Sequence, residues 1–334
     1  MPTIKEVSMR AKVSPSTVSR VLNGTTPVSA PVRRRVLAAV QELDYTPNAF
    51  ARGLATNRSG GVGITVNHIG SPYYGVILGG VEEAVEAAGM HLMVASGQAQ
   101  ADKERSAIQF MRQRRSDALI VQAEALADEE LIDLVRSSEA PVVIFGRYVP
   151  ELHGRCVHLD NELGGRIATE HLIDHGHRTV GHLAGPLSFP DSRHRLQGYR
   201  QALDAAGLRF DERLVVEGDF REEGGYAATR RLLERVPNLH AIFVANDQMA
   251  AGAIRAASDL GRDVPSDLSL VGFDDVLLAQ YVSPALTTVR QPLRDMGRAA
   301  ADIAIARLLG RKGEVRTRFE PELVLRQSVA HVAR

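Results

Sequence analysis

Four histidines lie close together in the sequence, at His171, His175, His177 and His182. Residues four apart on a helix share one face, so His171 and His175 could present two imidazole nitrogens to a zinc ion. No glutamate completes a His-Glu-x-x-His motif, and no third ligand follows at motif spacing. The single cysteine, Cys156, cannot form a disulfide within the chain or a cysteine metal cage. We therefore expect no metal and no cofactor.

Three polar residues fall at the ends of predicted strands in the second half of the chain. Asn246 and Asp247 follow the apolar run Ala241–Ala245, and Asp274 follows Leu268–Gly272. Open α/β sheets bind ligands at the carboxyl ends of their strands, and carboxylates with amides suit the vicinal hydroxyls of a sugar or polyol. A turn at Asn246 and a helix cap at Asp274 are the structural alternatives.

Motifs of nucleotide-dependent or acyl-transfer chemistry are missing from the sequence. It contains no G-x-G-x-x-G, no Walker A string and no G-x-S-x-G elbow. A serine triad assembled from distant residues is not excluded by one sequence. We nevertheless expect a binding protein and no enzyme.

Charge is distributed unevenly along the 334 residues. The chain has 40 basic and 40 acidic side chains, yet nine basic and three acidic residues lie between Met1 and Ser59. The N-terminal segment is therefore +6 and the remainder −6. A basic segment attracts phosphates, which makes double-stranded DNA the expected partner of the N-terminal segment alone. The acidic remainder is expected to have no affinity for DNA, even at low salt.

Local signals predict three short helices in residues 1–46. Thr3 and Glu6 form a capping box, Ser14 followed by Pro15 marks a second helix start, and Ser29 can cap a third helix. On the third helix, Leu37 is predicted to face inward with its valine and leucine neighbours. Two short helices joined by a tight turn within a basic unit indicate a helix-turn-helix, and a small three-helix bundle with a polar surface is the alternative.

The second of these helices offers DNA-reading side chains in its first turn. Ser16 and Thr17 can bond bases or phosphates, and Arg20, one turn later, can reach guanine O6 and N7. Residues 47–60 then contain a breaker, a short helical stretch and a polar, Gly-rich linker. We divide the N-terminal part into a helix-turn-helix domain, 1–46, and a hinge helix with linker, 47–60.

After residue 60, apolar strand-like runs alternate with amphipathic helical segments. Continuous apolar strands that alternate with helices predict parallel sheets covered on both faces. About ten such strands exceed one comfortable domain, so we predict an α/β fold of two doubly wound parallel-sheet lobes behind an all-α head. The lobes are predicted as 61–160 plus 292–320 and 161–291 plus 321–330, with a ligand cleft between them.

Several strings, in this order and spacing, closely resemble the LacI/GalR family of bacterial transcriptional regulators. In the head they are TIKEV at 3–7, VSPSTVSRVLNG at 13–24 and YTPNA at 45–49. In the body they are DN at 160–161, HLI at 171–173, GHR at 176–178, GPL at 185–187, ANDQMA at 245–250, VGFDD at 271–275 and LTTVRQP at 286–292. The resemblance covers essentially the whole chain.

The resemblance implies a homodimer that represses transcription from a palindromic operator, with one head on each half-site. It also implies a hinge helix from Asn48 to Ala55 that orders on DNA and inserts Leu54 into the minor groove, the alternative being head-to-body packing. Gly53 weakens that helix, and Lys12 stands where relatives commonly have glycine. The implied DNA-binding residues are Ser14, Pro15, Ser16, Thr17, Arg20, Asn23, Tyr45, Asn48, Arg52 and Leu54.

For the body, the resemblance implies a periplasmic-binding-protein-like domain that holds a small effector between its lobes. Sugar or polyol is favoured over purine, and induction over co-repression. Core packing of the aromatic residues and an Arg195–Asp191 ion pair are the alternatives. The implied effector-binding residues are Tyr73, Tyr74, Arg147, Phe189, Asp191, Arg195, Phe220, Asn246, Asp274 and Gln291.

The remaining expectations concern location and assembly. No apolar run reaches membrane-spanning length, and charges follow Met1 closely, so we expect a cytoplasmic protein without a leader peptide. A solute-binding transport protein is the alternative from another class. The residues after Glu322–Ser328 are too few for a leucine-heptad tail, so a dimer is expected.

Overall fold

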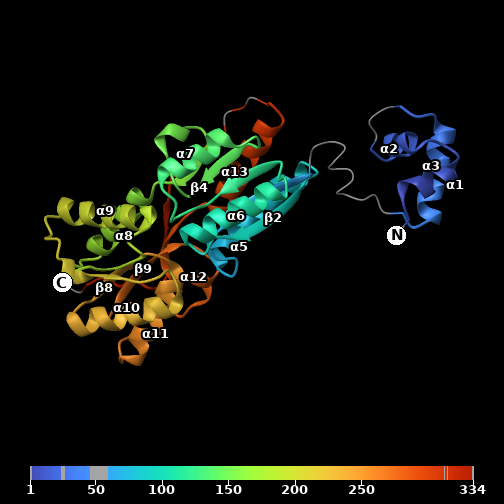
Figure 1. Cartoon of the computed structure of the whole chain (residues 1–334). Helices are drawn as coiled ribbons and strands as arrows, with labels where there is room; N and C mark the ends of the chain where they lie inside the picture. The colour runs from blue at the N-terminus through green and yellow to red at the C-terminus, as the bar shows by residue number, and fades with distance from the viewer. Residues whose placement is uncertain (1, 24–26, 46–58, 312, 314, 333–334) are drawn as a thin grey trace. The chain divides into compact units, whose positions relative to one another are not determined.

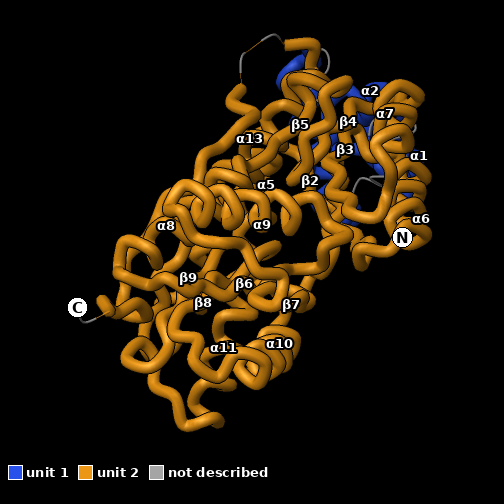
Figure 2. Tube along the Cα trace, turned by 90° about the vertical axis from the view of Figure 1, so that its left-hand side faces the viewer, with its two compact units in different colours: residues 1–60 blue, residues 61–334 orange. Residues whose placement is uncertain are grey.

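The computed structural model describes residues 2–23, 27–45, 59–311, 313 and 315–332 (Figure 1). The chain divides into two compact units, residues 1–60 and residues 61–334, which Figure 2 colours separately. The proposed hinge helix, with Asn48, Arg52 and Leu54, lies outside the described residues. Among the described helices, none combines the length and the apolar character needed to cross a bilayer.

Unit 1 is a three-helix unit whose helix starts follow local sequence signals. The Thr3 N–H donates to Glu6 Oε2 at 2.6 Å, and the Glu6 N–H donates to Thr3 Oγ1 at 3.4 Å, which confirms the capping box. The Thr17 N–H donates to Ser14 Oγ at 3.2 Å, so Ser14 caps the second helix as predicted. Ser29 precedes the third helix but makes no side-chain cap. The helices are α1 (Ile4–Ala11), α2 (Pro15–Asn23) and α3 (Ala30–Glu42).

Two residues of unit 1 are unusual for their positions: Lys12 has a left-handed backbone conformation, and Leu37 is exposed on a helix that packs in the core. Lys12, between α1 and α2, has φ 53° and ψ 51°, a left-handed conformation that costs a residue with a Cβ about 1 kcal/mol. The prediction that Leu37 faces inward is wrong: Leu37 is 46% exposed, and Ala39 is buried instead. Val36 and Val40 lie on the face of α3 that packs against the core. Leu37, one position after Val36, points away from that face.

Unit 2 contains the two predicted doubly wound lobes, each built on a six-stranded sheet. The first sheet, of the N-lobe, has the order β11-β5-β4-β3-β1-β2, with all strands parallel. Its strands are β1 (Gly61–Val66), β2 (His91–Ser96), β3 (Ala118–Val121), β4 (Val142–Phe145), β5 (Cys156–Leu159) and β11 (Arg318–Phe319). Its helices are α5 (Pro72–Ala87), α6 (Ala101–Gln113), α7 (Asp128–Ser137), η1 (Pro150–Leu152) and α13 (Leu293–Leu308).

The second sheet, of the C-lobe, has the order β12-β10-β9-β8-β6-β7, and only the β10–β12 pair is antiparallel. Its strands are β6 (Gly181–Ala184), β7 (Val215–Glu217), β8 (Ala241–Val244), β9 (Ser269–Asp274), β10 (Thr287–Arg290) and β12 (Glu322–Val324). Its helices are α8 (Asn161–Asp174), α9 (Pro190–Ala205), η2 (Glu212–Leu214), α10 (Glu222–Arg235), α11 (Asp247–Asp259) and α12 (Leu278–Tyr281).

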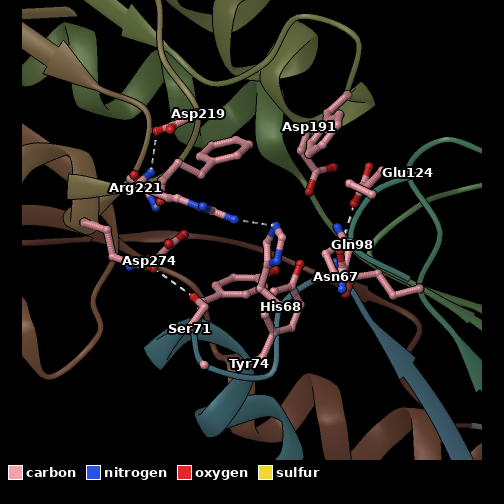
Figure 3. Close-up of a pocket in the computed structure, with 18 of the residues that line it drawn as sticks. Asn67, His68, Ser71, Tyr74, Gln98, Glu124, Asp191, Asp219, Arg221 and Asp274 are labelled. Carbon is pink, nitrogen blue, oxygen red and sulfur yellow. Dashed lines mark hydrogen bonds between the residues drawn. The ribbon is translucent and has the colours of Figure 1, made fainter. Parts of the chain in front are cut away.

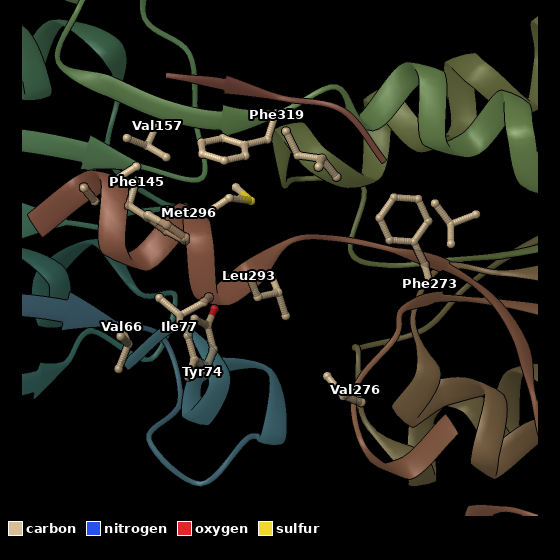
Figure 4. Close-up of a cluster of buried hydrophobic side chains, with 14 of the residues drawn as sticks. Val66, Tyr74, Ile77, Phe145, Val157, Phe273, Val276, Leu293, Met296 and Phe319 are labelled. Atoms are coloured by element: carbon tan, nitrogen blue, oxygen red, sulfur yellow. The ribbon is translucent and has the colours of Figure 1, made fainter. Parts of the chain in front are cut away.

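The chain crosses between the lobes three times, between β5 and α8, between β10 and α13, and between β11 and β12. One apolar cluster has members on both lobes near these crossings, and Figure 4 draws some of them. Tyr74 and Ile77 of α5 and Met296 of α13 belong to its N-lobe side, and Phe273 and Val276 belong to its C-lobe side. The lobes are therefore linked both covalently and by packing.

Glycines bring α8 and α9 close enough to place the start of α9. A Cβ on Gly165 would lie 2.2 Å from the Arg195 carbonyl oxygen, and one on Gly198 would lie 2.0 Å from the Glu162 carbonyl oxygen. Only glycine permits backbone contact at these distances. The close contact between α8 and α9 holds Arg195 of α9 at the edge where the C-lobe strands end.

Candidate functional site

A cavity of about 590 Å³ lies within unit 2, where the carboxyl ends of the strands of both lobes meet (Figure 3). Both lobes line it, and the side chains shown in Figure 3 project into it from opposite sides. Eight of the ten proposed effector-binding residues line this cavity, whereas Arg147 and Gln291 do not. The eight are Tyr73, Tyr74, Phe189, Asp191, Arg195, Phe220, Asn246 and Asp274.

Arg195 is the central charge of the C-lobe side. It is 3% exposed, and its Nε donates to Asn161 Oδ1 at 2.8 Å while Nη1 donates to the Ala245 carbonyl oxygen at 2.5 Å. Its guanidinium also stacks on the Phe273 ring, 3.7 Å from the centroid. Nη1 lies 3.8 Å from Asp274 Oδ1, so the carboxylate nearest to Arg195 is Asp274. These contacts hold the guanidinium rigidly.

Asp274 and Gln291 form a second buried pair on the same side. Gln291 Nε2 donates to Asp274 Oδ1 at 2.6 Å, so Gln291 contacts a lining residue without lining the cavity itself. Asp274 is the last residue of β9, whereas the sequence placed it beyond the strand. Burial raises the pKa of Asp274 to about 7, although the Arg195 guanidinium opposes the shift.

Asn246 directly precedes α11, and both polar atoms of its side chain already have hydrogen-bond partners. Its Oδ1 accepts from the Met249 N–H at 3.0 Å, and its Nδ2 donates to the Phe220 carbonyl oxygen at 3.0 Å. Asn246 therefore caps a helix and also fixes the strand-to-helix loop that carries Phe220. Phe220 has φ 65° and Asp274 has φ 109°, so two residues that line the cavity have backbone conformations unfavourable for side chains with a Cβ. Such strain collects at functional sites.

The N-lobe side differs because it presents polar atoms without partners. Asn67 Oδ1 and Gln122 Oε1 are buried and accept no hydrogen bond in the described part of the chain. Asn67 follows β1 and Gln122 follows β3, so both lie at the carboxyl edge of the sheet. A buried acceptor without a donor costs roughly 1–3 kcal/mol, which a ligand hydroxyl would recover.

Glu124 enters the cavity from a loop that two other side chains clamp. Glu104 of α6 is 1% exposed and accepts backbone N–H bonds of 2.8–3.2 Å from Glu124, Ala125 and Leu126. Arg147 donates to the Leu126 carbonyl oxygen at 2.8 Å and pairs with Asp128 at 2.6 Å. Arg147 thus supports this loop from outside the cavity.

Two carboxyl groups approach each other across the cavity, Glu124 from the N-lobe and Asp191 from the start of α9 (Figure 3). Burial, together with the charge of Asp191, raises the pKa of Glu124 to about 8. Burial also raises the pKa of Asp191, against the pull of Arg195. Two neighbouring carboxyl groups disfavour each other's ionisation, so the pair retains a proton. The protonated carboxyl can donate a hydrogen bond to a ligand.

Two hydrogen bonds connect the lobes at the cavity. The Ser71 hydroxyl donates to Gln248 Oε1 at 2.8 Å, and Arg221 Nη2 lies 3.3 Å from His68 Nε2. Burial and the nearby Arg221 lower the pKa of His68. These bonds connect opposite walls of the cavity in the described structure.

Asn67, Gln98, Gln122 and Glu124 also line the cavity but were not singled out from the sequence. Asn67 directly follows the predicted strand Gly61–Val66, and Gln122 directly follows Ala118–Val121. The rule that selected Asn246 and Asp274 on the C-lobe would have found both on the N-lobe. The signal was therefore present in the sequence.

In unit 1, the residues proposed to read DNA lie at the start of α2. Pro15, Ser16 and Arg20 are exposed, and Thr17 is half-buried. Ser14 Oγ lies 2.8 Å from Ser16 Oγ and 2.9 Å from Thr17 Oγ1, so the three hydroxyls form one local network. Tyr45 is half-buried against the core of unit 1, and the side chain of Asn23 lies outside the described part.

The clustered histidines contact other protein groups through hydrogen bonds and ring packing. His177 Nε2 lies 3.0 Å from Ser269 Oγ, and His182 is fully buried between the Tyr199 and Phe243 rings. The His175 ring packs against the rings of His171 and His331, at centroid distances of 4.2 Å and 4.1 Å. Among the described residues, no group of three or more histidine, cysteine or acidic side chains is arranged to hold a metal.

Comparison with known proteins gives matches along nearly the whole chain. Residues 3–48 match the model of bacterial regulatory proteins of the lacI family, and residues 169–329 match a periplasmic binding protein-like domain. The transcriptional regulator GalR of Escherichia coli K12 is 40% identical, covering 99% of this chain and 96% of GalR. The transcriptional repressor PurR of Klebsiella pneumoniae is 36% identical, covering 99% and 97%.

Solved structures match at similar coverage. A lac repressor dimer bound to operator and the anti-inducer ONPF aligns with a TM-score of 0.88 and 29% identity, covering 98% of this chain and 99% of that one. A complex of the regulator CelR with cellobiose aligns with a TM-score of 0.73 and 35% identity, covering 98% and 100%. These relatives are transcriptional regulators and not enzymes, as predicted.

Proposed function

Because the chain belongs to the LacI family of bacterial transcriptional regulators and has that family's effector-binding domain, we propose how it works. It is a repressor that binds a palindromic operator in the cytoplasm as a homodimer. A sugar or polyol that binds between the lobes releases it. The DNA-binding match at residues 3–48 argues against a solute-binding transport protein, which would need no such head.

The unpartnered acceptors of the N-lobe wall carry the proposal of a hydroxyl-rich ligand. Asn67 Oδ1 and Gln122 Oε1 need hydrogen-bond donors, and sugar hydroxyls supply donors on several sides of one small molecule. The C-lobe wall adds Asp191 and Asp274, which can accept from further hydroxyls, and Phe220, whose ring can cover a sugar face. CelR, a relative, has been solved with cellobiose.

Coupling of the cavity to the DNA-binding head follows from a change in how the two lobes of unit 2, joined by three chain crossings, are arranged. A ligand shifts an equilibrium only by its different affinity for the two states, here two arrangements of the lobes. The cavity has walls on both lobes, so a ligand that bonds both walls favours one arrangement. In a dimer, that arrangement changes the spacing of the segments that lead to the heads, and with it the fit to two half-sites.

Exposed apolar residues on the C-lobe support assembly into a dimer. Leu277 is 64% exposed and Tyr281 is 78% exposed, next to and within α12. Large apolar side chains at such exposure are typical of interaction surfaces. Sedimentation equilibrium should give a dimer, and a stable tetramer would contradict the proposal.

A purine co-repressor is the second candidate, and one feature of the cavity favours it. The Phe189 and Phe220 rings lie 6.1 Å apart with an interplanar angle of 35°, a spacing between which a planar base could insert after a small adjustment. PurR is among the relatives. A ligand screen that contains both sugars and nucleobases separates the two candidates.

A thermal-shift screen of sugars, polyols and nucleobases tests the proposal. Each hit is then added to a gel shift of the full chain on duplexes from its own promoter region. We expect sugar or polyol hits that weaken DNA binding. Hits restricted to nucleobases that strengthen DNA binding would replace induction by a sugar with co-repression by a purine.

A further inference from the structure

The charged groups that line the cavity between the lobes are unbalanced. Its described lining includes the two arginines Arg195 and Arg221, and His68, whose lowered pKa keeps the ring neutral at neutral pH. It also includes five carboxyl residues, which are Glu124, Asp191, Asp219, Glu222 and Asp274. An excess of carboxyl groups in a cavity disfavours an anionic ligand and favours a ligand with a positive charge.

Three of the five carboxyl groups have hydrogen-bond donors in the protein. Asp219 accepts from a backbone N–H at 2.9 Å, and Glu222 accepts from a side-chain amide at 3.0 Å. Asp274 accepts from Gln291 at 2.6 Å. These three side chains therefore have partners before a ligand binds.

Glu124 and Asp191 are the two carboxyl groups that differ. Asp191 accepts no hydrogen bond from the described residues, and the Glu124 carboxyl has a long contact of 3.4 Å from Gln122 Nε2. Arg147 and Arg195 act on the pair through their charges, but they form their ion pairs with other carboxylates. Within the described part of the chain, the pair therefore lacks a cation at ion-pair distance.

The members of this pair come from opposite lobes and face one another in Figure 3. Glu124 follows β3 of the N-lobe, and Asp191 lies in the first turn of α9 of the C-lobe, where the helix dipole favours a carboxylate. A cation between them would form charge-assisted hydrogen bonds to both lobes at once. The proton that the pair retains would then pass to solvent, and the mutual repulsion of the two groups would be relieved.

Unpartnered acceptors lie on the N-lobe side of the same cavity. Asn67 and Gln122 are 4% and 5% exposed, and their side-chain carbonyl oxygens accept no hydrogen bond in the described part of the chain. With Glu124 these residues present acceptors, which a ligand must meet with donors. An ammonium group has three donors and no acceptor, whereas a hydroxyl group also turns oxygen lone pairs toward the carboxyl groups. The lining therefore favours an amine beside hydroxyl groups.

We propose that the ligand of this cavity is an amino sugar, whose protonated amine lies between Glu124 and Asp191. Its hydroxyl groups donate to Asn67 and Gln122. A volume of about 590 Å³ is ample for a monosaccharide or a disaccharide. This inference rests on the proposed function, because it names which hydroxyl-rich molecule the cavity selects. It also predicts that the cavity discriminates against sugar phosphates.

Titration calorimetry of the full chain with matched sugars tests the proposal. Glucose, galactose and mannose are each compared with their 2-amino forms at constant ionic strength. The pH is about 6.5, below the range of about 7.7–8.0 in which α-amino groups lose their proton. We expect at least one amino sugar to bind about tenfold or more tightly than its parent sugar, the ratio typical of a hydrogen bond to a charged group. Neutral N-acetylglucosamine and anionic glucose 6-phosphate should bind no better than glucose.

Two single variants locate the amine. Glu124→Gln and Asp191→Asn each remove one carboxylate with little change in shape, and each should reduce the preference for the amino sugar over its parent by about tenfold. Glu223→Gln, at an exposed position of α10, removes the same charge outside the cavity and should keep the preference. The melting temperature of each variant without ligand checks that it folds, and the two cavity variants test the pair independently.

The possible outcomes separate this inference from the proposed function. Parent sugars that bind as tightly as their amino forms would overturn the inference and leave a sugar-responsive repressor. A preference for the amine that persists in both cavity variants would place the amine elsewhere and would also overturn it. Binding of nucleobases alone would overturn the inference together with the proposed function.

Discussion

The two lobes have sheets of the same order, yet they present different walls to the cavity between them. On the C-lobe, Arg195, Asp274 and Asn246 are bound to other protein groups before any ligand arrives. On the N-lobe, Asn67 and Gln122 keep buried acceptors without donors among the described residues. We call the C-lobe side the complete wall, because these three side chains already have protein partners, and the N-lobe side the incomplete wall, because two of its acceptors have no donor.

We propose that this difference lets one small molecule both bind selectively and move the lobes. A rigid wall fixes orientation at little cost in entropy, because its side chains are already ordered. An incomplete wall recovers hydrogen bonds only when the ligand and the N-lobe meet. Binding energy is therefore available to draw the N-lobe toward the C-lobe.

The largest effect is expected from Arg195→Ala on the complete wall. The change removes the guanidinium from Asn161 and from Asp274, which keeps only its hydrogen bond from Gln291, and breaking a buried charge pair costs about 3–5 kcal/mol. Urea unfolding of the full chain should show this destabilisation in unit 2. Arg213→Ala, which breaks a pair that is exposed to solvent, is the control and should change stability little. Equal destabilisation by both variants would mean that Arg195 is not the centre of a rigid wall.

A smaller effect is expected from Glu104→Ala, which releases the loop that carries Glu124. Removing the buried carboxylate leaves the N–H groups of Glu124, Ala125 and Leu126 without their acceptor. The Leu126 N–H is buried and accounts for about 1–3 kcal/mol, whereas the other two are part-buried and within reach of water. Hydrogen exchange of residues 124–126 should accelerate while exchange in α9 stays unchanged. Acceleration on both walls would show that the walls are not independent.

The pH dependence of stability tests the carboxyl pair between the walls. The pKa of Glu124 is raised to about 8, so the folded protein keeps a proton that the unfolded chain loses near its ordinary pKa of 4.5. Stability from this group is therefore full below about pH 4.5 and falls as the pH rises toward 8. Burial lowers the pKa of His171 and His182 to about 4, and these groups act in the opposite sense below about pH 6.5. The melting temperature of unit 2 should therefore fall as the pH is raised from about 6.5 to 8.

Glu124→Gln removes the titrating group and should flatten this fall, with Glu223→Gln at an exposed position of α10 as the control. Asp274, with a pKa of about 7, keeps part of the slope in both variants. An identical pH profile in the two variants would refute the interaction of Glu124 with Asp191 across the cavity.

The smallest effect is expected from Ser71→Ala, which removes the hydrogen bond to Gln248 on the opposite wall. A hydrogen bond of this kind contributes about 0.5–1.5 kcal/mol. Small-angle scattering of the ligand-free chain should show a larger average separation of the lobes. Unchanged scattering, together with unchanged stability, would mean that this bond does not hold the walls together.

Sequence signals within a few residues of one another predicted the helix starts and the order of strands and helices. The capping box of Thr3 and Glu6, the cap at Ser14 and the alternation of strands and helices depend on neighbours within a few residues, and the structure has all of them. The cavity-lining positions of Asn246 and Asp274 follow from the strand-end rule in the same way.

Contacts between distant residues could not be predicted in this way. The choice of Asp274 as the carboxylate nearest to Arg195 depends on how α9 meets β9, and the support of the Glu124 loop by Arg147 depends on how two loops meet. The burial of Ala39 in place of Leu37 was decided by the shape of the partner helices. Such outcomes depend on three-dimensional packing and not on spacing in the sequence.

Hydrogen exchange with the compound that releases DNA tests the central claim most directly. The account predicts slower exchange on both walls, at residues 67–74 and 122–126 of the N-lobe and at residues 191–195 and 219–222 of the C-lobe. Protection restricted to one lobe, or located away from the cavity, would contradict a ligand that acts by joining the two walls.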